Sequence, residues 1–145
     1  MASNASCLWS FWLIAILSLL WNLIGVIDFV MTLTRNADYL ASFTPEQIAY
    51  FTSFPPWFIF VWGCGVWGAL LGSILLLLRH RWAVSAFALS LAGLAVSSLW
   101  QYGLSGADLS AIMPPGAWVF TIVIWIIAIA LFYYSIRQRR RGVLR

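Results

Sequence analysis

The sequence predicts an all-α, polytopic membrane protein: a bundle of four transmembrane helices, with a short amphipathic helix in the outer loop between the first two. Three observations predict this fold. Of the 145 residues, 63% are hydrophobic and only 8% are charged, whereas about 25% of an ordinary soluble domain is charged. The apolar residues form four runs, each close to the ~20 residues that a helix needs to cross a bilayer. All but one of the arginines lie in different loops from the acidic loop residues. The composition excludes a soluble globular domain, a disordered chain and a nucleic-acid-binding protein.

The apolar runs predict the element boundaries. They occupy residues 7–33, 56–78, 82–102 and 117–136, within a single membrane domain over residues 1–145 that ends in a basic tail at residues 137–145. The first run follows no positively charged segment and is too long for the apolar part of a signal peptide. We therefore expect it to be a retained transmembrane helix.

The longest loop, residues 34–55, contains the signals of a helix start. Thr44 is a candidate N-cap, Pro45 suits the first helical position, and Gln47 completes a capping box. We expect a helix at about residues 45–53, on the outer membrane surface or over the mouth of the bundle. Two interpretations remain open: a structured connector, or a lid over an outward-facing cavity.

The charges predict the orientation. Seven of the eight arginines follow the second and fourth runs, whereas the loop acids Asp38, Glu46 and Asp108 follow the first and third. Positively charged loops stay in the cytoplasm, so we expect both termini there. The arginines after the fourth run are also candidates for binding lipid headgroups, although the topology alone explains them; they are Arg137, Arg139, Arg140 and Arg141.

The first run contains a polar stripe. Its members are Ser18, Asn22, Gly25, Asp28 and Thr32, which fall within about one third of a turn at 100° per residue. A carboxylate at the centre of a span costs about 2.5–3.5 kcal/mol on insertion scales, so Asp28 should face the bundle or a water-filled cavity. Either Asp28 hydrogen bonds with Thr32 or pairs with Arg35 in a structural role, or Asn22 and Asp28 form a proton- or substrate-coupled site.

The second run contains small residues four positions apart, which allow two helix backbones to approach closely in lipid. The two rows are Cys64, Gly68 and Gly72, and Gly65, Ala69 and Ser73. The third run offers a matching row of Ser85, Leu89, Gly93 and Ser97. This pattern predicts packing of the second helix on the third, or alternatively the seam of a homodimer.

The sequence contains few groups that carry chemistry. His80 is the only histidine, and Cys7 and Cys64 are far apart in apolar runs, so we expect no metal, no cofactor and no enzymatic activity. Four tryptophans away from the membrane interfaces pack in the core or line a pocket for a flat apolar ligand; they are Trp21, Trp62, Trp67 and Trp125.

Several stretches within residues 18–84 resemble a family of short bacterial four-helix membrane proteins of about this length. They are residues 20–25, 28–32, 43–47, 53–57 and the glycine-rich segment 65–79. Members of that family are often labelled sugar transporters. The resemblance implies a multi-pass protein of the bacterial inner membrane, and it assigns no catalytic or substrate-binding residue.

Two functions therefore compete. The first is a small transporter-like protein that acts as a parallel homo-oligomer in the lipid bilayer, because four helices are few to enclose a solute path. The second is a non-enzymatic accessory or scaffold subunit that packs against a larger membrane complex or binds an apolar ligand. The first needs a cavity that reaches Asn22 and Asp28, and the second needs a solid bundle with an exposed seam of small residues.

Overall fold

The computed structural model describes residues 2–145, with side chains from Leu8 onward. Within this part of the chain, four helices are long and apolar enough to cross a membrane, and we found no strand. They are α1 (Ala2–Leu33), α4 (Pro56–Leu77), α5 (Ala83–Leu99) with its π-helical continuation η1 (Trp100–Leu104), and α7 (Ala117–Arg140). The predicted four-helix membrane fold is confirmed, and the protein is a small integral membrane protein.

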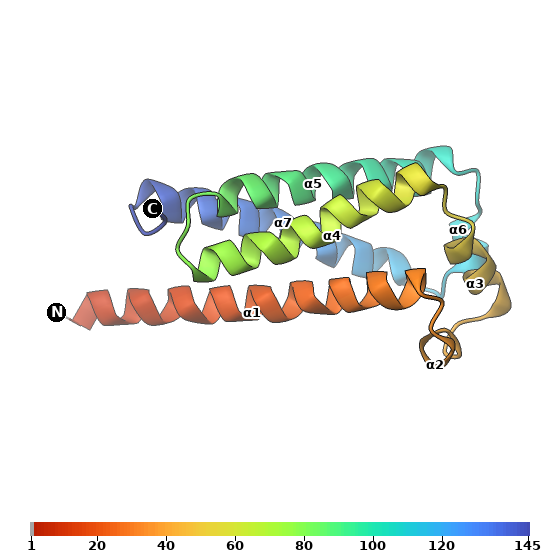
Figure 1. Cartoon of the computed structure of the whole chain (residues 1–145), viewed down its shortest axis with the longest axis horizontal. Coiled ribbons are helices and arrows are strands. Elements are labelled where there is room, and N and C mark those ends of the chain that lie inside the picture. The colour runs from red at the N-terminus through yellow and green to blue at the C-terminus, as the bar shows by residue number, and fades with distance from the viewer. Residues whose placement is uncertain (1) are drawn as a thin grey trace.

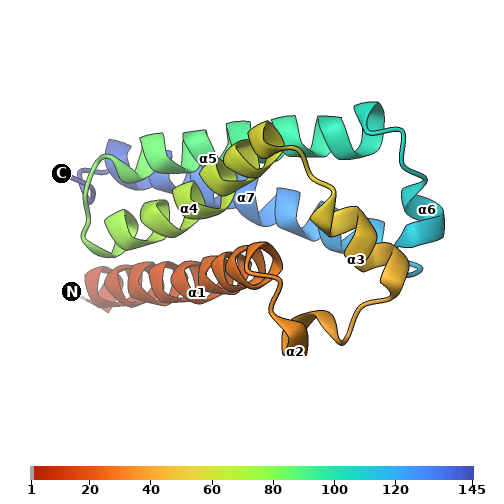
Figure 2. The ribbon, with the colours of Figure 1, turned by 45° about the vertical axis from the view of Figure 1, so that its right-hand side comes forward.

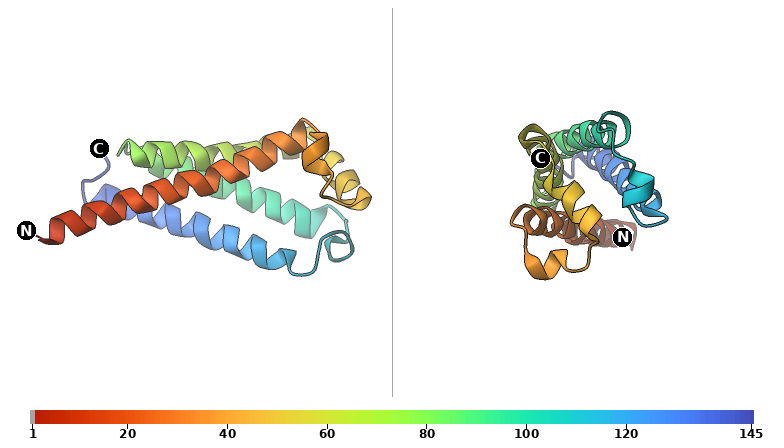
Figure 3. Two further views of the ribbon diagram at one scale, coloured as in Figure 1. Left: turned by 90° about the horizontal axis from the view of Figure 1, so that it is seen from below. Right: turned by 90° about the vertical axis from the view of Figure 1, so that its right-hand side faces the viewer.

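The four long helices surround one axis in the order α1, α4, α5, α7 (Figure 3). Helix α4 packs extensively on both α5 and α1, and α7 packs mainly on α5. Both chain ends lie at one end of the bundle, and the short helices α2 (Ala37–Leu40), α3 (Pro45–Thr52) and α6 (Leu109–Ile112) lie at the other (Figure 1). We refer to these as the terminal end and the loop end.

The glycine-rich face of α4 packs directly on α5. A Cβ atom built on Gly93 would lie 2.6 Å from the backbone nitrogen of Gly65, and one on Gly68 would lie 3.2 Å from that of Ser90. Gly72 is closed off by the ring of Phe87, whose Cδ1 atom would be 2.8 Å from an added Cβ. The predicted packing of the second span on the third is therefore correct, and the glycines are covered within the chain.

The small residues divide between two neighbours. Gly65, Gly68 and Gly72 face α5, whereas Ala69 and Ser73 bond with α1; Cys64 is partly exposed. On α5 the predicted row is wrong in two places, because Ser85 and Leu89 are exposed. The buried row alternates steps of three and four residues, as a helix of 3.6 residues per turn requires, and consists of Ala83, Ala86, Ser90, Gly93 and Ser97.

Helix α3 begins where the sequence predicts. The Thr44 hydroxyl accepts a hydrogen bond from the Gln47 backbone, and the Gln47 side chain accepts one from the Thr44 backbone, which completes the capping box. The helix ends at Thr52, with Ser53 as its C-cap, one residue before the predicted end. It lies across the loop end of the bundle (Figure 2), which agrees with the predicted position over the mouth.

Helix α7 is one turn longer than the predicted span of residues 117–136. Arginine and glutamine are good helix formers, and cations in the last turn interact favourably with the helix dipole, so the helix continues to Arg140. Gly142 then adopts φ 72° and reverses the chain. Leu144 is 4% exposed and packs in the apolar core with Phe11 and Leu131, so part of the predicted basic tail belongs to the core.

A substitution at the α4–α5 contact tests this packing. Gly93→Ala places a methyl group where the backbone of Gly65 lies, and overpacking of this kind costs about 1–3 kcal/mol. Gly25→Ala is the matched control, because nothing lies within 4 Å of a Cβ there and alanine stabilises a helix by about 0.5–1 kcal/mol relative to glycine. In detergent, we expect Gly93→Ala to lower the thermal unfolding midpoint and Gly25→Ala to keep or raise it. Equal midpoints for the two variants would contradict the close contact.

Candidate functional site

The polar residues of α1 form two separate groups. The first lies in the middle of the bundle, where Ser18, Asn22 and Ser73 hydrogen bond across α1 and α4. The Ser18 and Ser73 hydroxyl oxygens are 2.6 Å apart, and the Asn22 amide donates to the Ser73 hydroxyl at 2.8 Å and to the Ala69 carbonyl at 3.3 Å. Ser73 is fully buried. Such bonds between helices are worth about 0.6 kcal/mol on average in a membrane, so this group holds α1 on α4.

The second group lies at the loop end of α1. The Tyr39 hydroxyl, in α2, donates a hydrogen bond to the half-buried carboxylate of Asp28. Burial, and then the hydrogen bond to Asp28, raise the pKa of the Tyr39 phenol well above its usual range, so the phenol remains a donor at neutral pH. This bond links a membrane span to the loop that follows it.

The structure corrects the expected partners of Asp28. Arg35 is exposed, with φ 50°, and Thr32 is buried in α1 with 7% of its surface exposed. The Asp28 carboxylate bonds with Tyr39 instead of either residue. Asn22 is six residues from Asp28 along α1, about 1.7 turns, and bonds with α4. The four candidate residues therefore do not converge on one site.

An aromatic cluster closes the loop end of the bundle. At its centre, the Phe54 ring lies 5.2 Å from that of Tyr50 in α3 and 5.8 Å from that of Trp100 in η1. Phe58 is fully buried and lies 4.4 Å from Trp100. The π-turn places Trp100 here, since the Ser105 amide bonds with the carbonyl five residues before it. The cluster packs α3 onto α4 and α5.

Gln47 joins the two loops at the loop end of the bundle. Its side-chain oxygen accepts the capping-box bond from the Thr44 backbone at 3.2 Å, and its amide nitrogen donates to the carbonyl of Ile112 in α6 at 3.0 Å. The side chain is 9% exposed. One amide therefore caps α3 and attaches it to the loop between α5 and α7.

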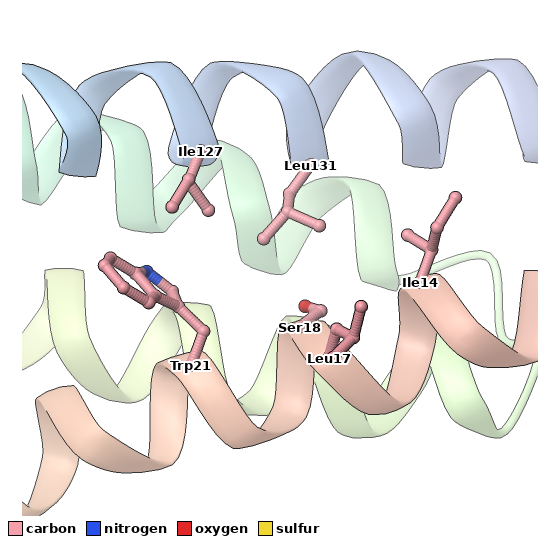
Figure 4. Close-up of a pocket in the computed structure, with 6 residues that line it drawn as sticks. All are labelled: Ile14, Leu17, Ser18, Trp21, Ile127 and Leu131. Atoms are coloured by element: carbon pink, nitrogen blue, oxygen red, sulfur yellow. The ribbon is translucent and has the colours of Figure 1, made fainter.

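A groove of about 280 Å³ runs between α1 and α7 (Figure 4). Its lining is apolar except for Ser18 and consists of Ile14, Leu17, Ser18, Trp21, Ile127 and Leu131. Asn22 and Asp28 are not among these described lining residues. The groove therefore fits the interpretation of Trp21 as part of an apolar pocket, and it does not connect the two polar groups.

The arginines at the end of α7 are available at the surface. Arg137, Arg139, Arg140 and Arg141 are all exposed. Among the described residues, we found no group of three histidine, cysteine or acidic side chains able to hold a metal ion. Comparison of the chain with protein-family models, with curated proteins and with solved structures gave no match. The interpretation of the site therefore rests on its geometry.

Sequence reasoning missed Tyr39 and the second bond of Gln47. Helix α2 has only four residues, so it has no periodic pattern; its N-cap is Asn36, whose side chain accepts a hydrogen bond from the Tyr39 backbone amide. The partner of Gln47 lies 65 residues away, and a local capping signal contains no information about it.

A double-mutant cycle tests the Asp28–Tyr39 bond. Tyr39→Phe leaves the carboxylate without this donor, and the loss should lower the free energy of unfolding by about 1–3 kcal/mol. Because Asp28→Asn removes the same charged acceptor, the double variant should lose less than the sum of the single losses. Unfolding in detergent measures the free energy of the two single variants and of the double variant. Tyr133→Phe, at an exposed tyrosine, is the control. Strictly additive losses would show that the pair is not coupled.

Proposed function

We propose that this integral membrane protein is transporter-like and that Asp28 is its coupling residue. The observation that carries the proposal is the bond between Asp28, inside a span, and Tyr39, in the outer loop. Ionisable groups inside membrane spans are costly and mark proton or solute pathways. The resemblance to short bacterial four-helix proteins labelled sugar transporters supports the same function.

The geometry suggests how coupling would work. An ionised Asp28 accepts a charge-assisted hydrogen bond from Tyr39, which is about twice as strong as a neutral one. Protonation removes the charge and weakens that bond, which loosens the attachment of α2 to α1. Proton binding at Asp28 would thereby change the packing of the outer loop at the mouth of the bundle.

The proposal includes a parallel homo-oligomer in the bacterial inner membrane, with both termini in the cytoplasm. The groove of a single chain does not reach Asn22 or Asp28, so the proposed solute path lies between copies of the chain. The strong charge bias favours one orientation for every copy. The positions of both chain ends and of the arginines at the terminal end of the bundle are consistent with this arrangement (Figure 1).

A second candidate function is a non-enzymatic accessory subunit that packs against a larger membrane protein. Helix α7 favours it, because α7 is the least buried of the four spans. Its outward face is apolar and aromatic, with Trp118, Ile122, Ile126, Ile129 and Tyr133 exposed. Large polar substitutions on this face would abolish its association with a partner helix.

Cysteine labelling tests the orientation. Glu46, Asp108, His80 and Arg140 are all exposed in the folded chain, so labelling at these positions reports the side of the membrane and not burial. In a variant lacking Cys7 and Cys64, a membrane-impermeant maleimide added to intact cells should label Glu46→Cys and Asp108→Cys. It should label His80→Cys and Arg140→Cys only after the membrane is opened. The reverse pattern would invert the proposed topology.

Uptake in proteoliposomes tests the coupling role. With a pH gradient imposed, we expect the parent to accumulate at least one of a panel of radiolabelled monosaccharides. Asp28→Asn should fold, because the amide keeps the shape of the carboxyl group, and should lose gradient-driven uptake. Asp38→Asn, a matched change at an exposed loop carboxylate, should keep it. Undiminished uptake by folded Asp28→Asn would overturn the coupling role, and no uptake by the parent would favour the accessory function.

A further inference from the structure

The groove between α1 and α7 is bounded by aromatic contacts. Toward the loop end, the Trp21 and Phe120 rings are 6.2 Å apart; toward the terminal end, the Phe11 and Tyr134 rings stack at 6.4 Å. Between them, Leu17 is 55% exposed although it lines the groove. The groove is therefore open at the side, where the bilayer lies.

Beyond the Phe11–Tyr134 contact, α7 continues toward two exposed arginines at its end. Ile127, Leu131 and Tyr134 follow each other at steps of four and three residues, so they share one face of the helix. Arg141, the C-cap, follows seven residues after Tyr134, and Arg137 lies four residues before Arg141, in the last turn of α7. Arg139 lies on a different face of α7. It is five full turns from Thr121 and therefore shares the face of Thr121, which hydrogen bonds with Tyr102 of η1 on the α5 side.

We propose that this groove binds one acyl chain of an anionic phospholipid, whose phosphate is held by Arg137 and Arg141. The apolar lining matches a hydrocarbon chain, and the two exposed guanidinium groups match the charge of a phosphate, which arginine binds with good geometry. The proposal is independent of the transport function, because neither Asp28 nor Tyr39 contributes to it.

The depth of the groove matches one leaflet. Ile127 is ten residues from Arg137, which is about 15 Å at 1.5 Å per residue. Half of a bilayer core of about 30 Å is also about 15 Å. A phosphate at the arginines therefore brings its acyl chain to Leu131 and Ile127. The lateral opening gives that chain access from the surrounding lipid.

A pair of tryptophan substitutions tests the acyl-chain site. Leu17 lines the groove, whereas Leu20 does not, and the two leucines have nearly equal exposure at 55% and 53%. The protein is purified in detergent with equal amounts of phosphatidylglycerol and phosphatidylcholine, and native mass spectrometry counts the retained lipid. We expect the parent and Leu20→Trp to keep phosphatidylglycerol and Leu17→Trp to lose it. Equal retention by both variants, or no phosphatidylglycerol on the parent, would overturn the proposal.

A pair of double substitutions tests the headgroup site. Arg137→Gln with Arg141→Gln should reduce the preference for phosphatidylglycerol about tenfold or more, since each arginine near the headgroups contributes substantially. Arg139→Gln with Arg140→Gln removes the same charge from other faces and should leave the preference intact. Glycerol 3-phosphate, which lacks acyl chains, should not displace the lipid. Equal losses in the two double variants, or displacement by glycerol 3-phosphate, would show non-specific attraction instead of this site.

Discussion

The backbones of α4 and α5 approach so closely at Gly65 and Gly93 that no side chain fits between them. In lipid there is no hydrophobic driving force between helices, so close van der Waals packing of this kind is a main force that associates them. The contact fixes α4, and the opposite side of α4 then receives α1 through Ser73 and Ala69. Helix α7 packs on a side of α5 away from α4, and the groove lies between α7 and α1.

Local signals predicted much of this arrangement. The four spans follow from hydropathy, and the capping box of α3 follows from three residues within one turn. The pairing of α4 with α5 follows from the glycine spacing, but the row on α5 was predicted with a constant step of four and therefore drifted to the exposed Ser85 and Leu89. Because a helix has 3.6 residues per turn, only alternating steps of three and four remain on one face.

The polar site was less predictable, because it depends on how the chain returns after α1. Asp28 was correctly singled out as an intramembrane carboxylate, but its partner Tyr39 lies in a four-residue helix that hydropathy does not reveal. Asn22, predicted to share a site with Asp28, bonds with α4 because Ser73 and Ala69 lie opposite it. Likewise, the charge of residues 137–145 predicted a basic tail after the last span, whereas Leu144 is buried in the core.

Gln47 has a consequence for how the loop end of the protein is recognised. Its two bonds join α3, which precedes the second span, to Ile112, which precedes the fourth. The surface at the loop end is therefore one composite surface made of segments about 65 residues apart in the sequence. An antibody selected on the folded protein would read both segments together as a conformational epitope, and a synthetic peptide of either loop would present only half of it.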